Sequence, residues 1–167
     1  MTRSTRDTRR NRVYAAEALV WNMFERADQL PGRQVEIFGS RVTLPIERRV
    51  VSLESMQTYV DTVLALETVR SRYKRARIPV TVRARRGQSR AHYEYPTATI
   101  AMPLHNRSML REFVLLHEIA HHLQPLGSPG HGRQFCKILC HLVELAIGAE
   151  AAWLLHATLA DTQADHS

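Results

Sequence analysis

Residues 117 to 121 read His-Glu-Ile-Ala-His, inside a stretch from Met109 to Gln124 whose apolar residues recur with helical periodicity. Residues four apart in an α-helix lie about 40° apart around its axis, so His117 and His121 are predicted to share one face. Two neutral imidazoles held one turn apart can bind one zinc ion, and Glu118 beside them can take a proton from metal-bound water. This short stretch constrains both fold and function more than any other part of the chain.

The apolar residues of this predicted helix form one broad stripe, which includes Phe113, Leu116, Ala120 and Leu123. Both motif histidines fall inside the stripe, and Glu118 lies at its edge. The polar side is expected to carry Ser108, Arg111, Glu112 and His122. Because buried imidazoles need partners, a shared metal ion is the natural interpretation of the pair.

A catalytic zinc needs a third protein ligand and an open position for water. Ser128 followed by Pro129 predicts the start of a second helix, with serine as N-cap and proline at the first helical position. That helix is expected to run to about Ile147 and to stop at Gly148. His131 falls on its apolar face at the end nearest the loop, and is the predicted third ligand.

Four further residues could in principle supply the third ligand. Glu144 and His141 fall on the polar face and the polar edge of the second helix. His122 is turned about 140° from His117 at helical spacing, which indicates a group that lies behind the ligands or on the surface. His105 precedes the motif helix and stays possible because loops can bend.

The residues His117 to His121, followed by His131-Gly132-Arg133-Gln134-Phe135, resemble the signature of SprT-like zinc metallopeptidases. The chain is most similar to a small group of HExxH metallohydrolases from actinobacteria and their phages, over about Tyr93 to Ala160. The resemblance implies that His117, His121 and His131 bind zinc and that Glu118 is the general base. The third histidine follows a longer spacer than in metzincins, and the zinc-ribbon cysteines of some SprT-like proteins are missing, so the substrate class stays open.

The net charge of +7 is carried almost wholly by arginine. Clusters occur at Arg3 to Arg12, Arg70 to Arg77 and Arg83 to Arg90. A nucleic-acid-facing surface is one interpretation. Solubility combined with an arginine-rich genome is the other, and the composition favours it because only one aromatic residue, Tyr73, is interleaved in these clusters for base stacking. Nucleic acid is therefore kept as an alternative partner.

No apolar run approaches membrane-spanning length, and the basic start, Met1 to Arg12, is not followed by a signal-peptide core. These features predict a cytoplasmic protein with no membrane partner. Cys136 and Cys140 are the only cysteines. Their spacing on one helix is a poor disulfide geometry, so we expect buried structural thiols in a reducing compartment. The oligomeric state is left open.

The predicted fold is α+β, a single zincin-like domain in which a small, mostly antiparallel sheet packs on the HExxH helix and further helices. Residues 1–160 are expected to form this domain and 161–167 a frayed tail. The expected elements are helices over Arg9–Gln29, Ser52–Arg72 and Ala149–Leu159, a hairpin over Gln34–Phe38 and Arg41–Leu44, and strands over Ile78–Arg86, Ala91–Tyr95 and Thr97–Met102. If Thr97–Met102 is a sheet edge, it could pair with an extended peptide substrate.

The leading functional prediction is a zinc-dependent metallohydrolase that acts on a peptide or protein substrate, with Glu118 as general base and then general acid. Zn²⁺ is the expected cofactor, although manganese or iron could occupy a three-histidine site. Tyr93, Tyr95 and His105 are candidates for stabilising the oxyanion. The competing prediction is a nucleic-acid-associated zinc protein, either a DNA-linked protease or a non-catalytic binding domain.

Overall fold

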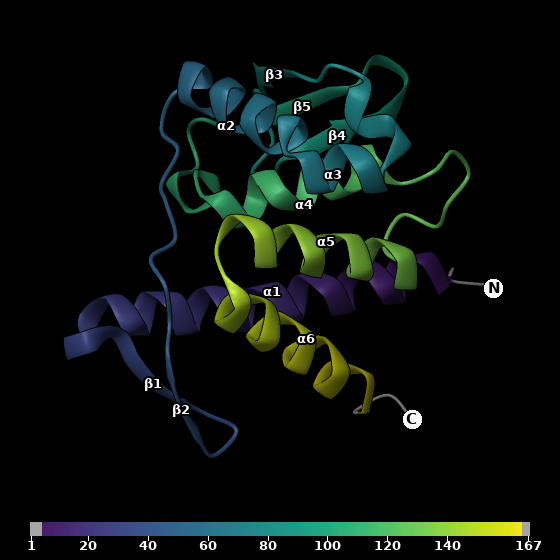
Figure 1. Ribbon diagram of the computed structural model, residues 1–167. Coiled ribbons are helices and arrows are strands. Elements are labelled where there is room, and N and C mark those ends of the chain that lie inside the picture. Colours follow the sequence, from purple (N-terminus) through teal and green to yellow (C-terminus); the bar gives the residue numbers. More distant parts are fainter. Residues whose placement is uncertain (1–4, 165–167) are drawn as a thin grey trace. The chain divides into compact units, whose positions relative to one another are not determined.

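The structure is a computed structural model that describes residues 5–164. Its helices and two small sheets form the mixed α+β fold predicted from the sequence (Figure 1). The chain divides into two compact units: residues 1–47 together with 128–167, and residues 48–127. Whether the chain is one domain over residues 1–160 stays a prediction.

The unit of residues 1–47 and 128–167 is built mainly from helices. Its elements are α1 (Thr5–Gln29), η1 (Pro31–Arg33), β1 (Gln34–Ile37), β2 (Ser40–Thr43), α5 (Arg133–Ala146) and α6 (Ala149–Ala164). Helix α6 packs against both α1 and α5 (Figure 1). The inward face of α1 is the one predicted from periodicity, since Val13, Ala16, Val20, Phe24 and Ala27 are all buried.

The hairpin of this unit also follows its sequence signal. Strands β1 and β2 pair antiparallel, with Ile37 opposite Ser40. The two residues between them, Phe38 and Gly39, have φ of 48° and 77°. Positive φ at both central positions is what a tight hairpin turn with the right-handed strand twist requires. The predicted strand ends differ from the observed ones by a single residue.

The unit of residues 48–127 combines helices with a three-stranded sheet. Its elements are α2 (Leu53–Ala65), α3 (Glu67–Arg72), η2 (Lys74–Arg77), β3 (Thr81–Ala84), β4 (His92–Glu94), η3 (Tyr95–Thr97), β5 (Thr99–Met102), η4 (Arg107–Met109) and α4 (Glu112–Leu123). The prediction of a single helix from Ser52 to Arg72 is wrong in one respect. The helix is interrupted at Leu66, whose ψ of 131° is extended. No glycine or proline marks this break in the sequence.

The order of the three strands corrects the expectation of a free edge at Thr97–Met102. Strand β5 is central, with β3 parallel on one side and β4 antiparallel on the other. All four of its residues are buried. Its backbone groups are therefore committed to the sheet, and the hypothesis that this strand pairs with a peptide substrate is wrong. Val82, Ile100 and Tyr93 lie side by side in register and form a buried layer on one face of the sheet.

Helix α4 lies in the interior of its unit and contacts α2, η2 and β4. The predicted polar side is wrong for Arg111, Glu112 and His122, which are as buried as the apolar stripe, whereas Ser108, in η4, is exposed as predicted. Glu112 and His122 have polar partners supplied by segments far away in the sequence. The Glu112 carboxylate, for example, accepts a hydrogen bond of 2.6 Å from the backbone N–H of Arg48. Such hydrogen bonds offset the free-energy cost of burying polar groups on a helix that is buried over most of its surface.

Candidate metal centre

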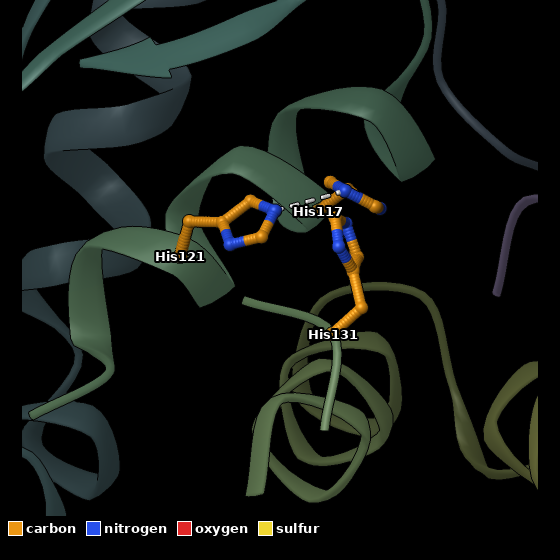
Figure 2. A group of neighbouring side chains, drawn as sticks. All are labelled: His117, His121 and His131. Atoms are coloured by element: carbon orange, nitrogen blue, oxygen red, sulfur yellow. Dashed lines mark hydrogen bonds between the residues drawn. The ribbon is translucent and has the colours of Figure 1, made fainter. Parts of the chain in front are cut away.

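Helix α4 places His117 and His121 one turn apart with their rings close together. The ring centroids are 4.9 Å apart, and the two Nε2 atoms are 3.2 Å apart (Figure 2). Two nitrogen ligands about 2.05 Å from a tetrahedral zinc ion lie about 3.3 Å from each other. The spacing of the two imidazoles therefore already matches the spacing that a shared zinc ion requires.

Glu118 follows His117 on α4 and is only 5% exposed. His117 is buried to a similar degree, whereas His121 is half-buried. A carboxylate in such a position costs free energy unless it interacts with polar groups or a bound ion. The motif thus places one acidic side chain and two imidazoles within five consecutive residues, in surroundings with little water.

His131 lies outside a helix, which corrects the sequence prediction. Helix α5 begins at Arg133 with Gly132 as N-cap, so the predicted N-cap at Ser128 is wrong. The imidazole of His131 is instead presented by the turn before α5, and its ring is 5.0 Å from that of Phe135 and 5.6 Å from that of Tyr14. The turn is short, since the N–H of Gly132 donates to the carbonyl of Pro129.

The three predicted ligands form one group in the structure. One candidate ligand atom each from His117, His121 and His131 lies within 4.8 Å of the others (Figure 2). Three imidazoles are a donor set that suits Zn²⁺, and the catalytic form of such a site leaves the fourth position to water or substrate. Across the described residues, no other set of His, Cys, Asp and Glu side chains forms a comparable group.

His122 is a buried hydrogen-bonded side chain. Its Nε2–H donates to the carbonyls of Arg75 at 2.9 Å and Ile78 at 3.1 Å, and its Nδ1 accepts from the Tyr93 hydroxyl at 2.7 Å. Burial, followed by the nearby Arg75 guanidinium, lowers the pKa of His122 to about 4, so its ring is neutral. Both ring nitrogens are engaged, which leaves neither for a metal.

His105, His141 and Glu144, which the sequence allowed as third ligands, also lie outside the histidine group. His105 and Glu144 are exposed and His141 is half-buried. The three imidazoles of the group are therefore those of His117, His121 and His131 alone, as far as residues 5–164 are concerned.

Two of the three candidates for an oxyanion partner are engaged in hydrogen bonds within the fold. The Tyr93 hydroxyl binds Nδ1 of His122. The Tyr95 hydroxyl donates to the backbone carbonyl of Gln124. Both tyrosines therefore hold other parts of the unit in place.

Cys136 and Cys140 are free thiols on α5 and are half-buried. Burial raises the pKa of both, that of Cys140 to about 12. They therefore stay protonated at neutral pH and do not belong to the histidine group. The expectation of buried thiols is therefore met only in part, because both side chains are half-buried.

Two residues next to the histidines were not identified from the sequence. Gln124 contacts His121 through its side-chain amide, and Tyr14 lies beside His131. Gln124 stands three residues after His121, so helical spacing could have indicated a contact. Tyr14 is more than a hundred residues from His131 in the chain, and no local pattern could have found it.

A scan against protein-family models and searches of curated proteins and of solved structures give no match to this chain. Within residues 5–164, no helix combines the length and apolar character needed to cross a membrane. The functional inference therefore depends on the chemistry and geometry of the side chains.

Proposed function

We propose that the protein is a zinc-dependent metallohydrolase that cleaves peptide bonds. His117, His121 and His131 would hold the metal and Glu118 would be the general base. The observation that supports this proposal is the convergence of three imidazoles next to a buried glutamate. A structural zinc site would need a fourth protein ligand, and the group found among the described residues supplies three.

The roles of the residues follow from this arrangement. A zinc ion bound there would polarise a substrate carbonyl and lower the pKa of a water molecule toward about 7. The carboxylate of Glu118 would accept a proton from the attacking water and then deliver it to the nitrogen of the leaving amine. Its burial removes bulk water that would otherwise compete for that proton.

The test of the chemistry is Glu118→Gln, assayed on a library of quenched fluorescent peptides. We expect the variant to bind one equivalent of zinc while its hydrolysis rate falls by about 10²–10⁴-fold, the usual contribution of a general base. Glu112→Gln is the matched control, because it makes the same change on the same helix and keeps an oxygen that accepts the Arg48 N–H. Full activity in Glu118→Gln would remove glutamate from the mechanism.

The test of the metal site is elemental analysis of the purified protein and two histidine variants. We expect one zinc per chain in the wild type, and its loss in His131→Ala. His105→Ala, at an exposed histidine outside the group, should keep the metal. Retention of a full equivalent of zinc by His131→Ala would show that the third ligand is another residue.

A second candidate function is suggested by the distribution of charge. Residues 48–127 contain thirteen Arg and Lys against six Asp and Glu, a net charge of +7. The rest of the chain contains ten of each and is neutral. We propose nucleic acid as a partner of the positive unit, and binding that weakens steeply with salt would support it.

The loop between β3 and β4 is one of the places in this unit where arginines gather. Arg85 closes the loop by donating to the carbonyl of Arg90, and Asn106 donates to the carbonyl of Ser89. The second bond brings the turn with the exposed Arg107 next to the loop. Together these segments gather guanidinium groups that suit phosphate.

The proposed location remains the cytoplasm. It is supported by the two free, protonated thiols, which are compatible with a reducing compartment.

A further inference from the structure

The two ring nitrogens of His121 have different partners. Its Nε2 lies 3.2 Å from Nε2 of His117, on the side of the proposed metal. Its Nδ1 lies 3.2 Å from Oε1 of Gln124. Since an amide oxygen can only accept, the hydrogen must be on Nδ1, and the lone pair of Nε2 is then directed toward the metal side. The contact thus selects one tautomer of the ring.

The position of Gln124 is itself fixed by several contacts. It is the C-cap of α4, with an extended ψ of 140°, and is 4% exposed. Its backbone N–H donates to the carbonyl of His121 at 3.3 Å, and its own carbonyl accepts from the Tyr95 hydroxyl at 3.1 Å. The backbone of Gln124 is therefore hydrogen-bonded at both its N–H and its carbonyl group, which fixes the point from which the side chain projects.

Arg75 strengthens the same end of the helix. Its guanidinium carbon lies 4.0 Å from the centre of the Tyr95 ring, and its Nε–H donates to the carbonyl of His122 at 2.7 Å. The last carbonyl groups of an α-helix have no partner within the helix. Here Arg75 binds the carbonyl of His122 and Tyr95 binds the carbonyl of Gln124. These two hydrogen bonds keep Gln124 close to His121.

We propose that Gln124 is a positioning residue of the metal site, whose Oε1 fixes the tautomer and the ring orientation of His121. This inference rests on the proposed function. Hydrogen bonds to the far nitrogen of a metal-binding histidine keep its ring aligned and increase its basicity, and their loss commonly weakens metal binding by about 10–100-fold. Without the acceptor, the ring of His121 can rotate or exchange its tautomer, and both changes remove the lone pair from the metal.

The experiment compares zinc dissociation constants of the full chain, measured by competition with a chromophoric chelator. Gln124→Met removes the acceptor and keeps the length of the side chain, and we expect about 10–100-fold weaker zinc binding. Gln124→Glu keeps the acceptor oxygen and should bind zinc at least as tightly as the wild type. Gln88→Met, at an exposed glutamine of the β3–β4 loop, is the matched control and should be unchanged.

The melting temperature of each metal-free variant separates positioning from stability. A purely structural role predicts a lower melting temperature of Gln124→Met with an unchanged zinc dissociation constant, and this result would overturn the inference. A second measurement uses the wild-type protein, so it does not require any variant to fold. In the zinc-loaded protein, ¹⁵N–¹H correlation spectra should show a protonated Nδ1 and a metal-bound Nε2 in His121, and binding through Nδ1 would overturn the inference.

Different experimental results would refute this inference and the proposed function. A wild-type chain that binds no zinc overturns both. If the wild type binds zinc through His117 and His121 while Gln124→Met binds within about threefold of it, only the role of Gln124 is wrong.

Discussion

At the scale of single residues, His122 joins the end of α4 to two other segments of its unit. We expect His122→Phe to lower the free energy of unfolding by about 2–4 kcal/mol. The change leaves the Tyr93 hydroxyl and the carbonyls of Arg75 and Ile78 without the imidazole as a partner, and a buried unsatisfied polar group costs about 1–3 kcal/mol. His105→Phe, at an exposed histidine, should change the free energy by less than about 0.5 kcal/mol. Urea unfolding of the metal-free proteins measures both, and equal stability of the two variants would contradict a structural role.

The reactivity of the thiols gives a prediction that depends on pKa. Burial, followed by the neighbouring Cys136, raises the pKa of Cys140 to about 12. The thiolate is the reactive form and is populated only as the pH approaches the pKa, so at pH 8 its fraction in the folded chain is far below that of a free cysteine. We expect alkylation by iodoacetamide at pH 8 to be slow in the native protein and fast in urea, as followed by mass spectrometry. Rapid alkylation of the native protein at Cys140 would show that the thiol is accessible and ionised.

The residues that could be predicted from the sequence are those whose neighbours are set by local spacing. The proximity of His117 and His121 follows from helical geometry and could be stated without a structure. The burial of His122 and Glu112 could not, because their partners come from segments far away in the chain, such as Tyr93 for the histidine and Arg48 for the glutamate. A polar residue on the polar side of a helical wheel indicates exposure only when no such partner exists.

At the scale of secondary-structure elements, the types of helices and strands were predicted better than their boundaries. The start of α5 shows why. Ser128 and Pro129 are a good helix start, but Gly130 and Gly132 follow, and glycine costs about 1 kcal/mol in a helix relative to alanine. The chain forms a turn there, and the helix begins only at Arg133. His131 could be proposed from the motif, but its presentation by a turn could not.

The cap of α2 is an element whose stability can be tested. The Ser52 hydroxyl accepts from the N–H of Ser55 at 3.1 Å, and the Ser55 hydroxyl accepts from the N–H of Ser52 at 3.2 Å. We expect Ser52→Ala to cost about 1 kcal/mol, because an orphan N–H of the first turn loses its partner. Ser71→Ala, in α3 and exposed, should have almost no effect. The difference between the two urea midpoints is the measurement, and its absence would show that water replaces the cap without cost.

At the scale of the whole molecule, composition gave the net charge but not its distribution. The arginines before residue 13 and those between residues 70 and 90 look alike as sequence clusters. The division into units separates them, because the first cluster belongs to a unit whose acidic residues balance its basic ones. A helical wheel or a motif could not reveal this, since it depends on which distant segments share a unit.

This distribution predicts that DNA affinity depends on where charge is removed and not only on how much. Arg86→Gln with Arg90→Gln removes two exposed cations from the positive unit, whereas Arg9→Gln with Arg26→Gln removes two exposed cations from α1 in the neutral unit. Each phosphate neutralised contributes about 0.9 to the slope of log K against log salt. We therefore expect the first variant to lose about 2 from this slope and the second to keep it, in fluorescence anisotropy of a labelled duplex between about 50 and 200 mM salt. Equal losses would mean that net charge alone drives association, and no binding at about 50 mM salt would exclude nucleic acid as a partner of this unit.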